Sequence, residues 1–158
     1  MIYSWLRGAP YVSTSRSEIQ GILNEISIKK NSTFVELGCG DGRVVRYAAK
    51  EYEVQGLGIE INPTLVWLAR LRAKLDGTAQ HVRFEVKNIF DVDVSQANYV
   101  YIFLFPALLR KLQPQLEQAL HNKAIIISRG FQIKYFEKFL FKKYKGKRFT
   151  TYYYKISN

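Results

Sequence analysis

Apolar residues along the chain follow two alternating patterns. Short runs of consecutive or alternating apolar residues are typical of strands buried in a sheet, and we expect five of them, at 33–37, 54–60, 82–86, 99–104 and 124–128. Between these runs, apolar residues recur every three or four positions, which predicts helices at 18–28, 43–52, 63–76 and 106–120. Strands that alternate with helices imply a mostly parallel, twisted sheet with right-handed crossovers. We therefore predict an α/β protein with a Rossmann-like core flanked by helices.

Local signals mark several helix boundaries. Ser15 or Ser17 can cap the first helix, and Asn62 followed by Pro63 is a typical helix start. Gly77 ends that later helix. Pro114 falls inside the helical pattern after Pro106 and should kink or divide the helix, because proline lacks the amide hydrogen that a helix interior needs.

The last part of the chain has a different composition. From residue 134 to 155, aromatic residues alternate with basic ones, and Lys145-Gly146-Lys147 is a plausible turn between two strands. We interpret 131–158 as a terminal antiparallel hairpin with a basic outer face. The same alternation is also found in proteins that bind single-stranded nucleic acids. We expect one domain over 1–158, with an N-terminal segment and helix (1–32), a core (33–130) and this hairpin.

Bulk properties narrow the function classes. The 158 residues carry a net charge of +11, which favours a polyanionic neighbour such as nucleic acid, an anionic membrane surface or an acidic protein. No apolar run reaches the roughly 20 residues that span a bilayer, so we expect no transmembrane segment and a cytoplasmic protein, or one held peripherally at an anionic membrane surface. One cysteine and two histidines exclude an internal disulfide and give no sign of a metal site.

The candidate chemistry centres on the glycine-rich stretch after the first strand. Gly38, Gly40 and Gly42 follow Glu36 with the spacing acid-x-Gly-x-Gly-x-Gly, and Cys39 lies within the turn. Bare glycines allow backbone to approach a ligand, and the start of a helix offers it amide hydrogens. This stretch resembles the first motif of the class I methyltransferases, which use S-adenosylmethionine. The resemblance implies that cofactor, whose ammonium group suits a nearby carboxylate.

Two further anchors follow the next two strands. Glu60 ends the second strand about 20 residues after the glycines, the spacing typical of a carboxylate that binds ribose hydroxyls, and Ile61 follows it. Asn88 and Ile89 follow the third strand. In the class that the glycine motif resembles, these positions meet the adenine ring, although an ordinary turn is an alternative. All these residues fall near the carboxyl ends of strands, where such sheets bind ligands.

A narrower resemblance extends over roughly residues 9–120. Several stretches together are similar to the seven-strand lysine methyltransferases that modify the ATP synthase c-subunit and the adenine nucleotide translocase, and to their short prokaryotic relatives. The stretches are Ala9-Pro10-Tyr11-Val12, the residues 37–45, 58–67 and 102–106, and Gln115-Leu116-Glu117. The resemblance implies that the Tyr11 segment folds over the cofactor, with Glu36, the glycines, Glu60 and Asn88 holding it.

Three departures from that family limit what can be carried over. The mitochondrial members have an N-terminal hydrophobic targeting region, for which this sequence has no counterpart. Ser13 stands where relatives often have a second proline, and the residues after Ser128 match poorly. The exact substrate therefore cannot be transferred from the family.

The expected reaction is methyl transfer to a lysine side chain of a protein. A lysine amine must be neutral to attack, and an apolar, aromatic pocket lowers its pKa by desolvation. Tyr11, Phe103 and Phe105 are candidate walls, and we expect no dedicated general base. Two alternatives stay open: an RNA or other nucleic-acid methyltransferase, which the charge favours, and a module that binds S-adenosylmethionine without catalysis. The substrate protein of the first hypothesis could itself be associated with a membrane.

Overall fold

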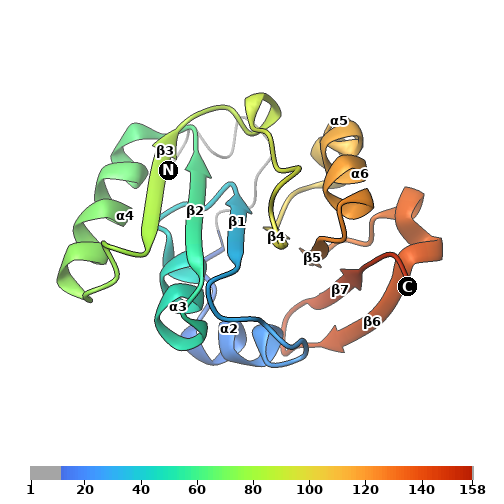
Figure 1. Cartoon of the computed structure of the whole chain (residues 1–158), viewed down its shortest axis with the longest axis horizontal. Helices are drawn as coiled ribbons and strands as arrows, with labels where there is room; N and C mark the ends of the chain where they lie inside the picture. The colour runs from blue at the N-terminus through green and yellow to red at the C-terminus, as the bar shows by residue number, and fades with distance from the viewer. Residues whose placement is uncertain (1–11, 158) are drawn as a thin grey trace.

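The computed structural model describes residues 12–157, and its centre is one seven-stranded sheet (Figure 1). The strands lie in the order β3-β2-β1-β4-β5-β7-β6. The first five are parallel to one another, whereas β7 is antiparallel to both β5 and β6. Their bounds are β1 Thr33–Leu37, β2 Gln55–Glu60, β3 Val82–Val86, β4 Tyr99–Ile102, β5 Ile125–Arg129, β6 Leu140–Lys145 and β7 Thr150–Tyr154. The predicted α/β, mostly parallel Rossmann-like sheet with a terminal antiparallel hairpin is thus confirmed.

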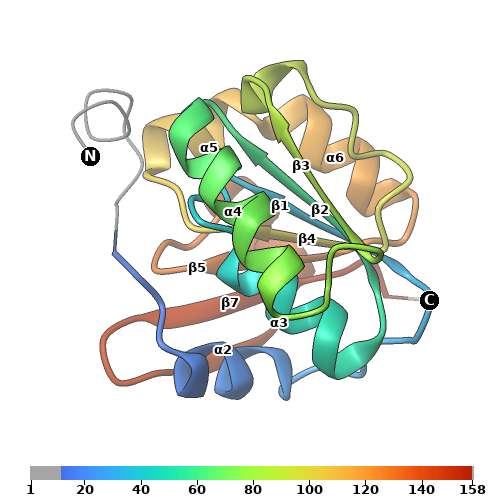
Figure 2. The same ribbon diagram turned by 90° about the vertical axis from the view of Figure 1, so that its left-hand side faces the viewer.

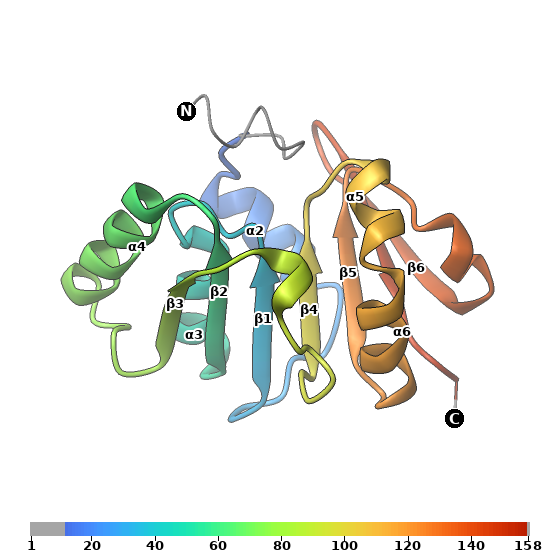
Figure 3. The same cartoon turned by 90° about the horizontal axis from the view of Figure 1, so that it is seen from above.

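Helices cover both faces of the sheet (Figure 3). On one face lie α2 (Arg16–Leu23), α3 (Arg43–Tyr52) and α4 (Pro63–Leu75), whose apolar residues share one buried cluster with Phe34. On the other face, α5 (Pro106–Lys111) and α6 (Gln113–His121) pack in a second cluster with Val35 and Ile102. Alternate residues of β1 therefore point into different cores, as the two-residue period of a strand requires.

Most predicted boundaries agree with the structure, and one helix is shorter than expected. The predicted start of α4 is confirmed, because the Asn62 side chain accepts hydrogen bonds from the first turn. Pro114 divides its helical pattern into α5 and α6. The helix predicted over 18–28 was wrong at its end, since α2 stops at Leu23. Beyond it, the Tyr99 hydroxyl bonds the backbone of Ser27 and Lys29, a contact that the local pattern could not reveal.

The C-terminal part combines the expected hairpin with an unexpected short helix. Strands β6 and β7 pair antiparallel, and Lys142, Lys143 and Lys145 lie exposed on β6. The residues before β6, which we included in the hairpin over 131–158, instead form a 3-10 helix over Lys134–Phe139. Phe136 of that helix is buried against Tyr154, so packing on β7 decided the conformation. No helix within residues 12–157 is long and apolar enough to cross a bilayer.

Candidate active site

A cavity opens at the carboxyl ends of β1 and β4. Its lining comes from the N-terminal segment 12–14, from the glycine-rich turn after β1, and from the end of β4. The lining residues are Val12, Ser13, Thr14, Glu36, Gly38, Cys39, Gly40, Asp41, Arg43, Val44, Tyr101 and Phe103. The cavity therefore lies where parallel α/β sheets bind ligands, at the carboxyl ends of the strands and at the point between β1 and β4 where the strand order reverses.

Glu36 and Tyr101 form the buried polar floor of this cavity. They lie side by side in the parallel pairing of β1 with β4. The Glu36 Oε2 atom is buried without a hydrogen-bond partner among the described residues. The Tyr101 hydroxyl is also buried; it faces the Thr14 and Arg129 side chains but makes no hydrogen bond of standard geometry with the described residues. Burial raises the pKa of Glu36 well above its usual value, and the charges of Asp41 and Glu60 add to the effect. A ligand with a cationic donor would satisfy both groups, since an unpaired buried polar atom is costly.

The glycine turn brings backbone to the cavity without side chains. Gly38, Gly40 and Gly42 all have positive φ, at 82°, 55° and 74°. At Gly42, which precedes α3, an added Cβ would stand 2.4 Å from the Phe84 ring. The turn therefore needs glycine at position 42 both for its backbone conformation and for close packing of α3 on β3.

Glu60 holds the glycine turn from the end of β2. Its Oε2 accepts a hydrogen bond of 3.0 Å from the Gly40 amide, and its Oε1 accepts one of 3.0 Å from the Asn62 amide. Each carboxylate oxygen can accept a second hydrogen bond. Glu60 is thus fixed in position, is 6% exposed, and keeps acceptor capacity for a ligand at the edge of the cavity.

Asp41 is buried in the same turn but is occupied by arginines. Arg43 donates to both of its carboxylate oxygens, and Arg72 from α4 also pairs with it. Although burial opposes ionisation, the hydrogen bonds and charge of Arg43, with the charge of Arg72, lower the pKa of Asp41. Asp41 is therefore an ionised group that ties α3 to α4, and its role is structural.

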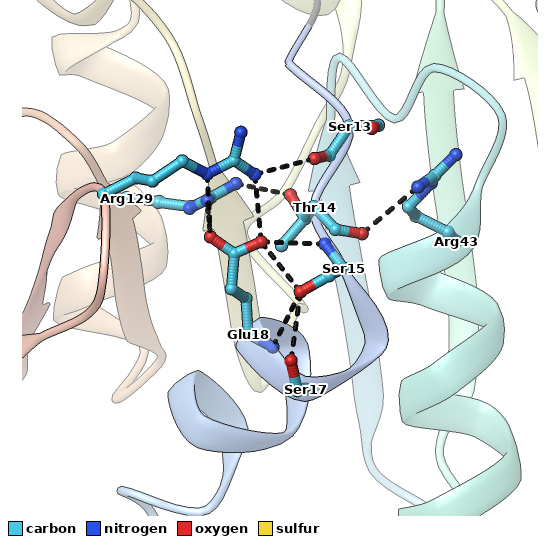
Figure 4. A network of polar contacts seen from close by, with 8 residues as sticks. Ser13, Thr14, Ser15, Ser17, Glu18, Arg43 and Arg129 are labelled. Carbon is cyan, nitrogen blue, oxygen red and sulfur yellow. Dashed lines mark hydrogen bonds and ion pairs between the residues drawn. The ribbon is translucent and has the colours of Figure 1, made fainter.

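The N-terminal segment is held over the cavity by three arginines from distant parts of the chain (Figure 4). Arg43 donates to the Thr14 carbonyl at 3.2 Å, and Arg129 at the end of β5 donates to the Thr14 hydroxyl. Arg148 from the hairpin loop donates to the Ser13 carbonyl at 3.1 Å. The segment is thus attached to the glycine turn, the sheet and the hairpin at once.

Glu18 is the acid shared by two of these arginines. It accepts from Arg129 at 3.0 Å and from Arg148 at 3.0 and 3.2 Å, while its Oε2 also accepts from the Ser15 amide as part of a capping box. The hydrogen bonds from Arg148 lower the pKa of Glu18 to about 2, although burial opposes that shift. Glu18 therefore stays ionised at neutral pH.

Phe103 and Phe149 pack against Arg129 beside the cavity, and two more phenylalanines extend from Phe103. The Arg129 guanidinium carbon lies 4.8 Å from the Phe103 ring centre and 5.0 Å from that of Phe149. The Phe131 ring packs against Phe103 at 6.5 Å and against Phe105 at 5.5 Å between centroids. The cavity thus continues into an aromatic wall, of which Phe105 is the exposed end.

The structure brings together some of the predicted site residues and leaves others outside the cavity. Glu36, Gly38, Cys39, Gly40 and Phe103 line it. Five predicted residues lie near the same sheet edge without lining the cavity: Gly42, Glu60, Ile61, Asn88 and Ile89. The same holds for Phe105, and Tyr11 lies outside the described residues. Asn88 caps a 3-10 helix, where its side-chain oxygen accepts from the Phe90 amide at 3.1 Å.

Several functional candidates were missed from the sequence. Tyr101, Thr14 and Arg129 carried no motif, and their roles depend on partners far along the chain. The pairing register of β1 with β4 was the one signal that could have placed Tyr101 beside Glu36. Cys39 is buried, and burial raises the pKa of its thiol, so it is a small packing residue at the cavity and not a nucleophile. Within residues 12–157 no cluster of three or more metal-ligating side chains occurs.

Comparisons with known proteins agree with this geometry. Residues 36–139 match the sequence model of the ANTKMT methyltransferase domain. The chain is 35% identical over 122 residues to a Xenopus laevis protein named as the lysine N-methyltransferase of the ATP synthase c-subunit, and this match covers 77% of the chain. It spans 53% of that relative, about half of its length. A Saccharolobus islandicus (strain REY15A) protein named protein-lysine N-methyltransferase is 30% identical over 132 residues, 83% of this chain and 82% of the relative.

A solved structure is similar over nearly the whole chain. It is described as an RNA methyltransferase from Salinibacter ruber in complex with S-adenosyl-L-homocysteine. The two superpose with a TM-score of 0.83 at 31% identity, covering 90% of this chain and 92% of the other.

Proposed function

The chain belongs to the family of the ANTKMT methyltransferase domain, and from this premise we propose that it transfers a methyl group from S-adenosylmethionine to a lysine side chain of a protein. The observation that carries the proposal is the cavity at the end of β1. There the glycine turn, the unpaired Oε2 atom of Glu36 and the Tyr101 hydroxyl face the same space. Two relatives that match most of this chain are named as lysine methyltransferases.

The residues of the cavity fit S-adenosylmethionine. The Glu36 carboxylate and the Tyr101 hydroxyl offer acceptors for an ammonium group, and the glycine turn admits a ligand close to backbone. Glu60 would accept from ribose hydroxyls, and Asn88 with Ile89 would border the adenine ring. When bound, the cofactor supplies an activated methyl group on a sulfonium.

The remaining task of the protein is to orient a neutral lysine. Phe103 lines the cavity, and Phe105 and Phe131 continue the wall towards solvent. An aromatic wall removes water from the ammonium group, which lowers the pKa of the lysine and favours loss of its proton to solvent. It also keeps the amine aligned for in-line attack. We therefore propose that Phe103 and Phe105 form the lysine channel and that no side chain acts as a dedicated base.

The test is transfer of labelled methyl groups into an extract of the source cell that lacks this gene. Label that is removed by protease and recovered as methyl-lysine after acid hydrolysis is the expected result. The Phe105→Ala variant should lose most of the transfer while keeping cofactor affinity, because Phe105 is 40% exposed and does not line the cavity. The exposed Phe141→Ala on β6 is the matched control. Equal transfer by both variants would remove Phe105 from the channel.

RNA methylation is the second candidate, and two observations favour it. The similar structure from Salinibacter ruber is described as an RNA methyltransferase, and the net charge here is +11. In the experiment above, label removed by nuclease instead of protease would establish RNA as the acceptor. Binding of RNA that weakens steeply with salt would accompany it, since phosphate contacts release counterions. Tight cofactor binding with no label in either fraction would leave a non-catalytic binding module.

A further inference from the structure

One helix carries large apolar side chains on the face turned away from the core. In α4, Val66, Ala69 and Ala73 are buried against the sheet. The residues Trp67, Leu71 and Leu75 follow one another at intervals of four, so they share the opposite side of the helix. Their exposed fractions are 63%, 37% and 78%. In Figure 2, α4 lies in front of the sheet with no helix or strand over it.

The chemistry around this apolar stripe is cationic. Helix α4 contains Arg70, Arg72 and Lys74 and no acidic residue. Beside the stripe, between α4 and β3, lies a hollow whose charged lining is Arg70, Lys74, Arg83 and Glu85. Glu85 is engaged by Arg83 at 3.2 Å, so the lining keeps a positive excess. Val86 at the end of β3 adds a further exposed apolar side chain, 51% exposed.

We propose that this α4 surface, defined as Trp67, Leu71 and Leu75 with the cations Arg70, Lys74 and Arg83, docks on an anionic phospholipid bilayer. At the boundary of such a bilayer, Trp and Leu side chains enter the headgroup layer while Lys and Arg meet the phosphates. The positive charge of the α4 surface favours an anionic bilayer over a second copy of this chain. A second copy of this chain would bring the same cations together, whereas anionic headgroups neutralise them.

Docking on this surface would place the bilayer beside the cavity. Helix α4 begins at Pro63, two residues after Ile61 and directly after the carboxyl end of β2. The Trp67 end of the stripe is therefore the end closer to the cavity edge. The inference does not rest on methyl transfer, because every residue of the α4 surface lies outside the cavity lining.

The first experiment measures binding to vesicles by fluorescence. Trp5 and Trp67 are the two tryptophans of the sequence, so the Trp5→Phe protein reports on Trp67 alone. Vesicles of phosphatidylcholine with about 30% phosphatidylglycerol should shift the Trp67 emission to shorter wavelength, and added salt should reverse the shift. Pure phosphatidylcholine should bind far less. An unchanged spectrum with anionic vesicles would overturn the proposal.

The second experiment measures flotation with the same vesicles and distinguishes the α4 surface from the basic face of the C-terminal hairpin. Leu71→Ser with Leu75→Ser should weaken binding by about tenfold or more, and Lys74→Gln with Arg83→Gln by about fivefold for each cation removed. The matched control pairs Phe141→Ser with Lys143→Gln on the exposed hairpin strand β6. All variants should keep the wild-type melting temperature, because the replaced side chains lie at the surface.

Two results would overturn the inference in favour of another occupant. Loss of vesicle binding in the hairpin control alone would assign the membrane contact to β6. A lipid-free dimer that becomes monomeric in Leu71→Ser with Leu75→Ser, measured by light scattering, would show that a second copy covers α4.

Discussion

Glu36 on β1 and Tyr101 on β4 are neighbours in register, and each holds a buried polar atom that makes no hydrogen bond of standard geometry within residues 12–157. Both atoms belong to residues that line the same cavity. A fold keeps unsatisfied polar groups in its interior at a cost, and such groups concentrate where a ligand completes them. Substitutions of Glu36 and Tyr101 therefore test directly whether the cavity binds the cofactor.

Replacing Glu36 by Gln should separate ligand binding from stability. Without ligand, burial raises the pKa of Glu36 above its usual value near 4.5, so the wild-type protein loses stability as pH rises from there through the shifted pKa. Glutamine cannot ionise, so the variant should melt higher than wild type at pH 8, by roughly 2–4 °C for each kcal/mol. The difference should vanish near pH 4. Affinity for S-adenosylmethionine should fall about tenfold or more, because a charged hydrogen bond is lost.

Calorimetry and thermal melts measure both effects for Glu36→Gln. The control is Glu85→Gln, which changes a carboxylate on the edge strand β3 that pairs with Arg83. It should leave cofactor affinity unchanged. Unaltered affinity in Glu36→Gln would show that Glu36 does not contact the ligand.

Tyr101→Phe should weaken the cofactor complex without destabilising the free protein. The hydroxyl it removes faces Thr14 and Arg129 but makes no hydrogen bond of standard geometry with the described residues, so the free energy of unfolding should stay close to that of wild type. Affinity for S-adenosylmethionine should fall about tenfold. Tyr99→Phe is the matched control from the same strand, because its hydroxyl donates to Ser27 and accepts from Lys29. That variant should lose about 1 kcal/mol of stability and keep its affinity. The opposite pattern would exclude Tyr101 from the site.

Gly130→Ala should disturb the aromatic wall through Phe103. Gly130 has φ of 82°, and an added Cβ would stand 2.7 Å from the Phe103 ring. We expect a loss of about 2–3 kcal/mol in stability, which combines backbone strain with overpacking, and a fall in kcat that exceeds any change in cofactor affinity. Gly77 has a similar φ of 78°, and an added Cβ would meet no atom within 4 Å. Gly77→Ala should therefore lower the free energy of unfolding only by the backbone strain, about 1 kcal/mol. Methyl-transfer kinetics on both variants decide whether displacement of Phe103 matters.

Acid should release the N-terminal segment through Glu18. Its hydrogen bonds with Arg148 hold its pKa at about 2, below the usual 4.5, so its contribution to stability is complete above pH 4.5 and is lost as pH falls towards 2. Thermal melts across that window should therefore fall more steeply for wild type than for Glu18→Gln. Glu51→Gln removes the exposed pair with Arg16 and should retain the wild-type slope. Parallel curves for wild type and Glu18→Gln would contradict this role of the Arg129–Glu18–Arg148 network.

Local signals in the sequence determined the elements that frame the site. The acid-glycine spacing from Glu36 to Gly42 requires a turn with positive φ, and the structure has one at all three glycines. Strands β1 and β3 have the predicted bounds, and Asn62 with Pro63 starts α4 as expected. Such features depend on interactions between residues a few positions apart, so the local sequence pattern is enough to predict them. Glu36 and Glu60 each lie at or near the carboxyl end of a predicted parallel strand, so the sequence also predicted that they share one edge of the sheet.

Only the tertiary structure decided which side chains meet at that edge. Arg129 lies 115 residues from Thr14, and Arg148 lies 130 residues from Glu18, yet both pairs are in contact. Contacts across such separations depend on sheet register and on how the hairpin folds back, which no local pattern encodes. The same reason explains why the residues before β6 form a 3-10 helix and why α2 ends at Leu23. The Tyr154 hydroxyl accepts a hydrogen bond from the Ile133 amide, and the Tyr99 hydroxyl bonds the backbone of Ser27 and Lys29, so tyrosines distant in sequence satisfy the backbone there.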